Sequence, residues 1–282
     1  MPEKKRVLLA GESWVTTSTH IKGFDQFSTV TFHLGAERLQ TALADSPFDL
    51  TYMPSHQAAS DFPTTIEALR SYAAVLLSDI GANTLLLHPD VWLHGKTVPN
   101  RLKLIREYVR TGGGLAMIGG YYSFQGINGG ARYRNTPVEE ALPVSILAYD
   151  DRIEVPEGCK AEIVNPLHPI TKGLGKIWPP LLGFNEVVLK EGRGIELLAR
   201  APRDQGGHPL LVRALWRRTV RGLDLGHRAA LGTGGLRQMA WLHQALAPDA
   251  DLAGQGKLMT FYPVLATASL AGGKGGGNGS AG

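Results

Sequence analysis

Stretches rich in apolar residues recur along the first part of the chain, at 6–10, 49–53, 73–77 and 115–118. Each stretch is short and is followed by glycine, proline or polar residues. Apolar runs of this length that are bounded by turn residues are typical of strands buried on both faces of a parallel sheet. The pattern therefore predicts four parallel strands.

Segments with helical spacing of apolar residues separate these predicted strands. Residues 35–44 and the segment beginning at Pro99 each place apolar side chains on one helical face, and 64–72 is predicted to be a shorter helix. The glycines at 112–114 end the helix that begins at Pro99. A long loop is predicted between the first strand and the first helix. This alternation predicts an α/β fold: a flavodoxin-like, doubly wound parallel sheet with helices on both faces.

Shorter strands are predicted in the later part of the chain. They lie at 152–155, 161–164, 194–200 and 209–212, and Pro156-Glu157-Gly158 is predicted to form a turn between the first two. We expect residues 1–212 to form one domain, whose part from about 145 to 212 is a smaller strand-rich extension. The glycine-rich tail, 271–282, is expected to be disordered.

Polar residues follow several predicted strands, at the edge where open α/β sheets bind ligands. The carboxylates Glu12 and Asp79 are candidate acid or base residues. The candidate ligand-binding residues, expected to line one cleft at this edge, are Ser13, Asn83, Gly119, Gly120, Tyr121 and Ser123. Such a set suits a small polar ligand that carries hydroxyl groups. An equally open alternative is structural: Ser13 and Asp79 could cap turns or helices, and the two glycines could serve only a tight turn.

Three motifs at strand ends carry a family resemblance: Gly11-Glu12-Ser13-Trp14, the segment 78–83 (SDIGAN) and the segment 118–126 (IGGYYSFQG). Together they resemble a bacterial family of uncharacterised glutamine amidotransferase-like proteins within the class I glutamine amidotransferase-like superfamily. The segment 168–174 (HPITKGL) is also similar to the trehalose-utilisation-type branch of that superfamily. The resemblance covers about 6–212.

The resemblance implies which residues glutamine hydrolysis would require. Active members of the superfamily hydrolyse glutamine with a cysteine thiolate on a sharp turn after a strand, a histidine base and backbone donors. The matching turn here is Ile118-Gly119-Gly120-Tyr121, with glycine where active members place cysteine. Cys159 lies in the strand-rich region and is expected to be structural. The sequence thus predicts a protein without glutaminase activity that binds a small polar or carbohydrate-like ligand; the alternative is an enzyme using Glu12 or Asp79 as acid or base.

Composition and charge limit the kinds of partner and the cellular location that we expect for this protein. No apolar run is long enough to span a membrane, and the N-terminus lacks the apolar core of a signal peptide, so we expect a soluble, cytoplasmic protein. The single cysteine excludes an internal disulfide and a multi-cysteine zinc site. The net charge of +4 comes from eight arginines within 200–237, so nucleic-acid binding is not predicted. A homo-oligomer is left open.

The histidines and glycines do not form a recognisable cofactor site. Five loop histidines, which never pair at helical i, i+4 spacing, are His20, His33, His56, His88 and His94. No metal is therefore predicted. His168 is expected to order its own turn. The glycine-rich stretch 126–130 lacks the Lys-Ser/Thr of a phosphate loop, so no nucleotide cofactor is predicted.

The sequence after Val212 departs from the rest. The arginine surplus lies around this point, and amphipathic periodicity is lost in 213–218. Codons can be chosen for the following segment so that reading one base later gives Gly-Arg-Tyr-Gly-Ala-Gly-Arg-Ser-Val-Ala-Trp-Thr-Ser-Asp-Ile-Gly-Pro-His-Trp. That peptide resembles the family's missing strand, with a histidine at the strand end. We therefore expect 213–270 to be a frame-shifted reading of the gene, in which His227 and His243 have no catalytic role.

Overall fold

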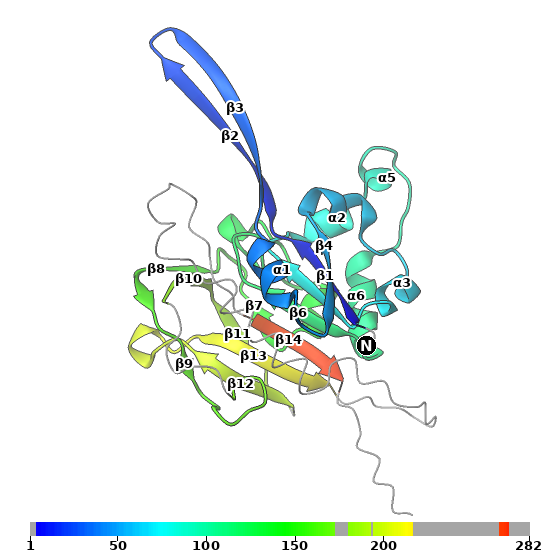
Figure 1. The fold of residues 1–282 in the computed structure, drawn as a ribbon, viewed down its shortest axis with the longest axis vertical. Coiled ribbons are helices and arrows are strands. Elements are labelled where there is room, and N and C mark those ends of the chain that lie inside the picture. Colours follow the sequence, from blue (N-terminus) through cyan, green and yellow to red (C-terminus); the bar gives the residue numbers. More distant parts are fainter. Residues whose placement is uncertain (1–3, 173–179, 193, 217–264, 271–282) are drawn as a thin grey trace, which may run out of the picture.

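The chain folds around one large sheet (Figure 1). The computed structural model describes residues 4–172, 180–192, 194–216 and 265–270. Its main sheet has eight strands in the order β4-β1-β5-β6-β14-β13-β12-β9. The predicted aberrant segment 213–270 and the predicted disordered tail fall mostly or wholly outside the described residues.

Four parallel strands form the first half of this sheet, as the apolar runs predicted. They are β1 (Lys5–Gly11), β4 (Phe48–Met53), β5 (Ala74–Ser78) and β6 (Gly114–Ile118). β1 pairs with both β4 and β5, and β5 pairs with β6. All residues of β5 and β6 are buried, which explains why their sequences are continuously apolar.

Helices connect these strands and cover the sheet on both faces. Their bounds are α1 (Glu37–Leu43), α2 (Ser55–Asp61), α3 (Ile66–Arg70), α4 (Ala82–Leu86), α5 (Pro89–Trp92), α6 (Arg101–Arg110) and α7 (Pro137–Ala141). The connection from β1 to β4 runs toward one edge of the sheet, and the later connections to β5 and β6 run toward the opposite edge. Because such crossovers are right-handed, α1 lies on one face of the sheet and the later helices lie on the other. On the other face α2 contacts α4, α4 contacts α6, and α6 contacts α3. The face of α6 that the sequence predicted to be apolar is buried.

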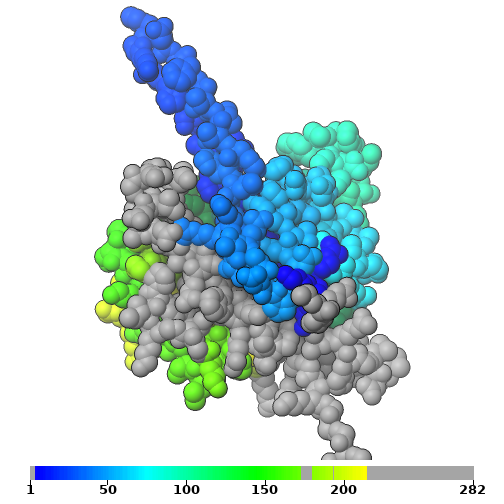
Figure 2. Space-filling model, viewed as in Figure 1, coloured from blue at the N-terminus to red at the C-terminus, as the bar shows by residue number. Residues whose placement is uncertain are grey.

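The predicted long loop after β1 is wrong. The chain instead forms a two-stranded antiparallel ribbon of β2 (Ser13–Lys22) and β3 (Asp25–Leu34), which projects from the body of the molecule (Figures 1 and 2). The segment is rich in Thr, Val, Ile and Phe, which favour strands. Because almost all of the ribbon is exposed, it lacks the buried apolar run by which the other strands were identified.

The strand-rich extension is confirmed, although it is not separate from the main sheet. β9 (Glu162–Ile163), β12 (Ile195–Arg200) and β13 (Pro209–Trp216) continue that sheet, and β14 (Leu265–Leu270) lies between β6 and β13. Two small antiparallel sheets complete the extension. They pair β8 (Arg152–Cys159) with β10 (Leu181–Asn185) and β7 (Val144–Ile146) with β11 (Val187–Leu189). Two short 3-10 helices, η1 (Ile127–Gly129) and η2 (Arg203–Gln205), lie in the connections.

The predicted turn at Pro156-Glu157-Gly158 is also wrong. These residues belong to β8, whose register with β10 shifts between Leu181 and Gly183. An irregularity of this kind bends a strand and accommodates extra residues without reversing the chain. Gly158, at φ 87, supplies the left-handed backbone that the irregularity needs.

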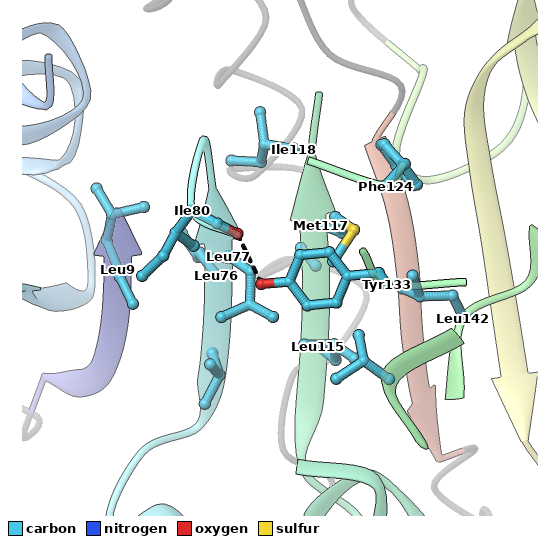
Figure 3. Packing of buried hydrophobic residues seen from close by; sticks show 14 of the residues in the cluster. Leu9, Leu76, Leu77, Ile80, Leu115, Met117, Ile118, Phe124, Tyr133 and Leu142 are labelled. Atoms are coloured by element: carbon cyan, nitrogen blue, oxygen red, sulfur yellow. Dashed lines mark hydrogen bonds between the residues drawn. The ribbon is translucent and has the colours of Figure 1, made fainter. Parts of the chain in front are cut away.

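A hydrogen bond in the core joins the segments that follow β5 and β6. Figure 3 shows Leu76, Met117 and Tyr133 among the buried side chains packed around β5 and β6. The Tyr133 hydroxyl donates to the carbonyl oxygen of Ile80 at 2.7 Å. This buried hydrogen bond ties the segment after β6 to the segment after β5, which fixes the two chain turns at the carboxyl edge of the sheet.

Candidate functional site

The carboxyl ends of β1 and β5 lie side by side, and each is followed by a carboxylate residue. Gly11 pairs with Ser78, and the Glu12 N–H donates to the Ser78 carbonyl oxygen at 2.9 Å. Glu12 and Asp79 both have φ 46, a left-handed conformation that non-glycine residues seldom adopt. Backbone strain of this kind persists where the surroundings hold it, and it clusters at functional sites. Glycine is required at position 11, because a Cβ there would lie 1.7 Å from the Ser78 carbonyl oxygen.

The Glu12 carboxyl lies in a poorly solvated position beside a second carboxyl. Burial and, to a lesser degree, the negative charge of Asp79 raise its pKa, whereas the hydrogen bond from the Ser78 hydroxyl lowers it; the net result is a pKa of about 7. The Tyr52 hydroxyl donates to the Glu12 backbone carbonyl at 2.7 Å. Burial and the Glu12 charge together raise the pKa of Tyr52 to about 12. Glu12 can therefore exchange a proton near neutral pH while Tyr52 stays protonated.

Asp79 is bound by the loop that follows β6. Its Oδ1 accepts the Tyr122 N–H at 2.7 Å, and its own N–H donates to the Ser123 hydroxyl oxygen at 3.1 Å. The Ser123 hydroxyl donates in turn to the Ile118 carbonyl oxygen. Burial raises the pKa of Asp79, and the N–H groups of Tyr122 and Tyr121 oppose that rise. Three strand ends, those of β1, β5 and β6, thus meet at the two carboxyls.

The glycine turn after β6 is fully engaged inside the protein. The Gly120 N–H donates to Asn185 Oδ1 at 2.9 Å, and Asn185 Nδ2 donates to the Gly120 carbonyl oxygen at 3.2 Å. A Cβ at position 120 would lie 2.8 Å from Asp79 Oδ1. Position 120 therefore has no room for a side chain in its present geometry, and the Gly120 N–H already has a partner.

Two buried polar residues that the sequence did not single out support this turn. Asn185 Nδ2 also donates to Asp151 Oδ1 at 2.8 Å. Asp151 accepts the N–H groups of Gln125 at 2.7 Å and Gly126 at 2.9 Å. Burial raises the pKa of Asp151, while the hydrogen bond from Asn185 lowers it. Their only signal in the sequence is a polar residue at a strand boundary, which is also typical of exposed turns.

The remaining predicted ligand-binding residues do not all face the two carboxyls. Ser13 is buried, and its hydroxyl oxygen accepts the Ser55 N–H at 2.8 Å, so it anchors the start of α2. Asn83 is exposed on α4. Gly119 is buried in the turn, and the Tyr121 ring lies 5.4 Å from the Arg152 guanidinium carbon. The structure brings together Glu12, Asp79, Gly120 and Ser123, and a ligand-binding role for each residue stays a prediction.

Cys159 is not part of this turn. It is the last residue of β8, pairs with Leu181 and is buried. Burial raises the pKa of its thiol to about 11, so the reactive thiolate is disfavoured at neutral pH. His168 lies instead beside Glu196 and Arg213, with 3.0 Å between His168 Nε2 and Glu196 Oε2.

Comparison with known proteins decides the family. A model of the family described as "Putative glutamine amidotransferase" matches residues 6–222. The chain belongs to this glutamine amidotransferase-like family. The match continues past Val212, where the resemblance in the motifs was expected to stop. A search of the curated proteins found no match.

Two solved structures are similar to this glutamine amidotransferase-like chain, and both are of cytoplasmic proteins from Salmonella typhimurium. The first, STM3548, has 42% sequence identity and a TM-score of 0.68, and the match covers 73% of this chain and 81% of that chain. The second, STM1381 from strain LT2, has 44% identity and a TM-score of 0.68, with 73% and 82% covered. These similarities agree with the α/β fold described above.

The described part of the chain contains neither a group of metal-ligand residues nor a membrane-spanning helix. Within 4–172, 180–192, 194–216 and 265–270, histidines, cysteines and acidic residues nowhere form a group of three or more that could hold a metal ion. In the same part of the chain, every helix is too short or too polar to cross a membrane.

Proposed function

We propose that this glutamine amidotransferase-like protein binds a small polar molecule with hydroxyl groups at the carboxyl edge of β1 and β5. The observation that carries the proposal is the pair of carboxyls of Glu12 and Asp79 on adjacent strand ends, both with raised pKa. A partly protonated pair offers both hydrogen-bond donors and acceptors, which matches a hydroxyl group that does both. Open α/β sheets bind ligands at this edge.

We further propose that the protein does not hydrolyse glutamine. The turn after β6 carries glycine, and a side chain at position 120 would meet Asp79 Oδ1. The only cysteine of the chain is buried on β8. The purified wild type is expected to release no more ammonia from glutamine than the Cys159→Ala variant does, because neither protein presents a thiolate at the turn. Ammonia release that the wild type shows and Cys159→Ala loses would contradict this statement.

Ligand binding is tested by thermal shift with a panel of monosaccharides, disaccharides and amino acids. A ligand at ten times its dissociation constant stabilises the folded state by about 1.4 kcal/mol, which raises the melting temperature by roughly 2–4 °C. At least one sugar or polyol is expected to give this shift in the wild type and not in Asp79→Asn. Glu37→Gln, an exposed change on α1, serves as the matched control and should keep the shift. A panel without effect, or a shift that Asp79→Asn retains, would contradict the site.

A second candidate function is acid–base catalysis on the same class of molecule. The observation that favours it is the pKa of Glu12 near 7, the value that suits proton transfer at neutral pH. Turnover of a ligand found in the panel would then fall by about 100-fold or more in Glu12→Gln. A ligand that binds and is never converted would leave the protein a binding protein.

A further inference from the structure

The ribbon of β2 and β3 has two different faces. Its residues pair in an unbroken antiparallel register from Ser13 and Leu34 at the base to Lys22 and Asp25 near the tip. Side chains alternate between the two faces, so residues paired across the strands share a face. With ten residues per strand, the ribbon extends about 33 Å. Figure 2 shows it as a narrow arm standing clear of the body.

One face is satisfied by contacts within the ribbon. Trp14 stacks on His33 with 5.2 Å between ring centroids, and His20 stacks on Phe27 at 4.6 Å. The His20 ring also hydrogen-bonds the Thr29 hydroxyl at 3.3 Å. This face combines hydroxyl groups and imidazoles with aromatic rings that stack on histidines, of which Trp14 is 38% and Phe27 48% exposed, so it is the more polar of the two faces.

The opposite face carries apolar side chains that are half or more exposed, and Phe32 at its base also contacts the His56 ring of α2, with 5.2 Å between ring centroids. Val15 is 60% exposed, Ile21 71%, Val30 66%, Phe32 50% and Leu34 53%. Val15 is paired with Phe32, and the others lie on the same face by alternation. An antiparallel sheet with one apolar and one polar face normally buries the apolar one. A two-stranded ribbon with nothing packed on it is only marginally stable in water.

We propose that this apolar face packs against the same face of a second copy of the chain across a twofold axis. A twofold interface brings a patch against itself, which is favourable when the patch carries no charge of one sign. The only formally charged residues of the ribbon are Lys22 and Asp25, one of each sign, at the tip. A second ribbon also matches the first in length and flatness. The proposal is independent of ligand binding at Glu12 and Asp79.

The available area is sufficient for a dimer. The five apolar residues present on the order of 500 Å² per copy, so a symmetric pair of faces buries roughly 1,000 Å², which is about the least that a biological interface is expected to bury. A nucleic acid or an anionic membrane surface does not fit, because such partners require clustered cations that the ribbon lacks.

The experiment is sedimentation equilibrium on the full chain with two neighbouring substitutions in β3. Val30→Lys places an ammonium on the apolar face, twice in a symmetric dimer, and Thr29→Lys makes the same chemical change on the polar face. The wild type and Thr29→Lys are expected to be dimers. Val30→Lys is expected to raise the dimer dissociation constant by more than about tenfold.

Three outcomes overturn the proposal: a monomeric wild type, a dimer that Val30→Lys leaves unchanged, or a dimer that both substitutions weaken equally. The double variant Val15→Thr/Val30→Thr keeps β-branched side chains and removes apolar area, so it weakens the dimer without weakening the strands. Circular dichroism and the melting temperature establish that each variant is folded. Binding to phosphatidylglycerol vesicles or duplex DNA by a monomeric wild type would assign the face to another partner and would equally overturn the proposal.

Discussion

At the scale of single residues, the carboxyl of Glu12 should make stability depend on pH. The folded chain raises its pKa from 4.5 to about 7, so across that window the folded protein holds a proton that the unfolded chain has released. The free energy of unfolding should therefore fall as pH rises from 4.5 to about 7, by up to about 3 kcal/mol. Urea denaturation at intervals across this window measures the slope. Glu12→Gln should flatten most of it, and the exposed Glu37→Gln should leave it unchanged; equal slopes in all three proteins would be inconsistent with a buried Glu12.

Asn185 is a second residue with a measurable role, because its amide joins Asp151 to the turn at Gly120. Asn185→Ala leaves the buried N–H and carbonyl of Gly120 without this partner and removes one of the three donors to Asp151, which should cost about 2–4 kcal/mol of unfolding free energy. Asn83→Ala, a change of the same chemistry at an exposed position on α4, should cost less than about 0.5 kcal/mol. Chemical denaturation of both variants distinguishes them, and similar losses would show that the network contributes little.

At the scale of elements, a buried guanidinium holds α2 against α6. Arg101 is the first residue of α6, is fully buried, and donates to the carbonyl oxygens of Ala58 at 2.9 Å and Ala59 at 2.8 Å. Arg101→Met removes both donors and should lower the free energy of unfolding by about 2–3 kcal/mol. The exposed Lys103→Met on the same helix should change it by less than about 0.5 kcal/mol. Equal effects in thermal denaturation would contradict this role.

The sequence predicted the elements whose buried positions form a continuous apolar run or recur at helical spacing. β5 and β6 are buried at every position, so their apolar runs could belong only to the interior, and α6 shows its buried face at helical spacing. The ribbon was missed because its apolar residues alternate with Thr and Ser and remain exposed, so they form no continuous buried run. β8 was divided wrongly because Pro156-Glu157-Gly158 is also a good turn sequence.

The candidate site was predictable only in part, for a similar reason. Glu12 and Asp79 follow strands that were identified, and parallel pairing then had to bring them to one edge. The sequence leaves open whether Ser13 binds a ligand or caps a helix, and it does not show that the Ser13 hydroxyl oxygen accepts the Ser55 N–H, because that contact depends on where α2 starts. Asn185 depends on β10, which no pattern in the sequence indicated.

At the scale of the whole molecule, the strand next to β6 comes from the segment after Val212. Here β14 lies there, antiparallel to β6 and parallel to β13. We propose that the gene is frame-shifted after Val212 and that the family's own strand, ending in Ser-Asp-Ile-Gly-Pro-His-Trp, belongs to the natural protein. Sequencing the DNA around that codon and measuring the intact mass of the natural protein test this. A single uninterrupted frame that encodes Arg213 to Gly282 in a stable product would end the proposal.

The sheet brings Glu12 and Asp79, which lie far apart in the sequence, to adjacent strand ends, where the charge of Asp79 contributes to the raised pKa of Glu12. The most direct test is a pH titration of the Glu12 side-chain carboxyl carbon by carbon-13 NMR, in the wild type and in Asp79→Asn. We expect a midpoint near 7 in the wild type and a lower midpoint in Asp79→Asn, because the negative charge of Asp79 is gone. A midpoint near 4.5 in both proteins, the ordinary value for a glutamate, would contradict it.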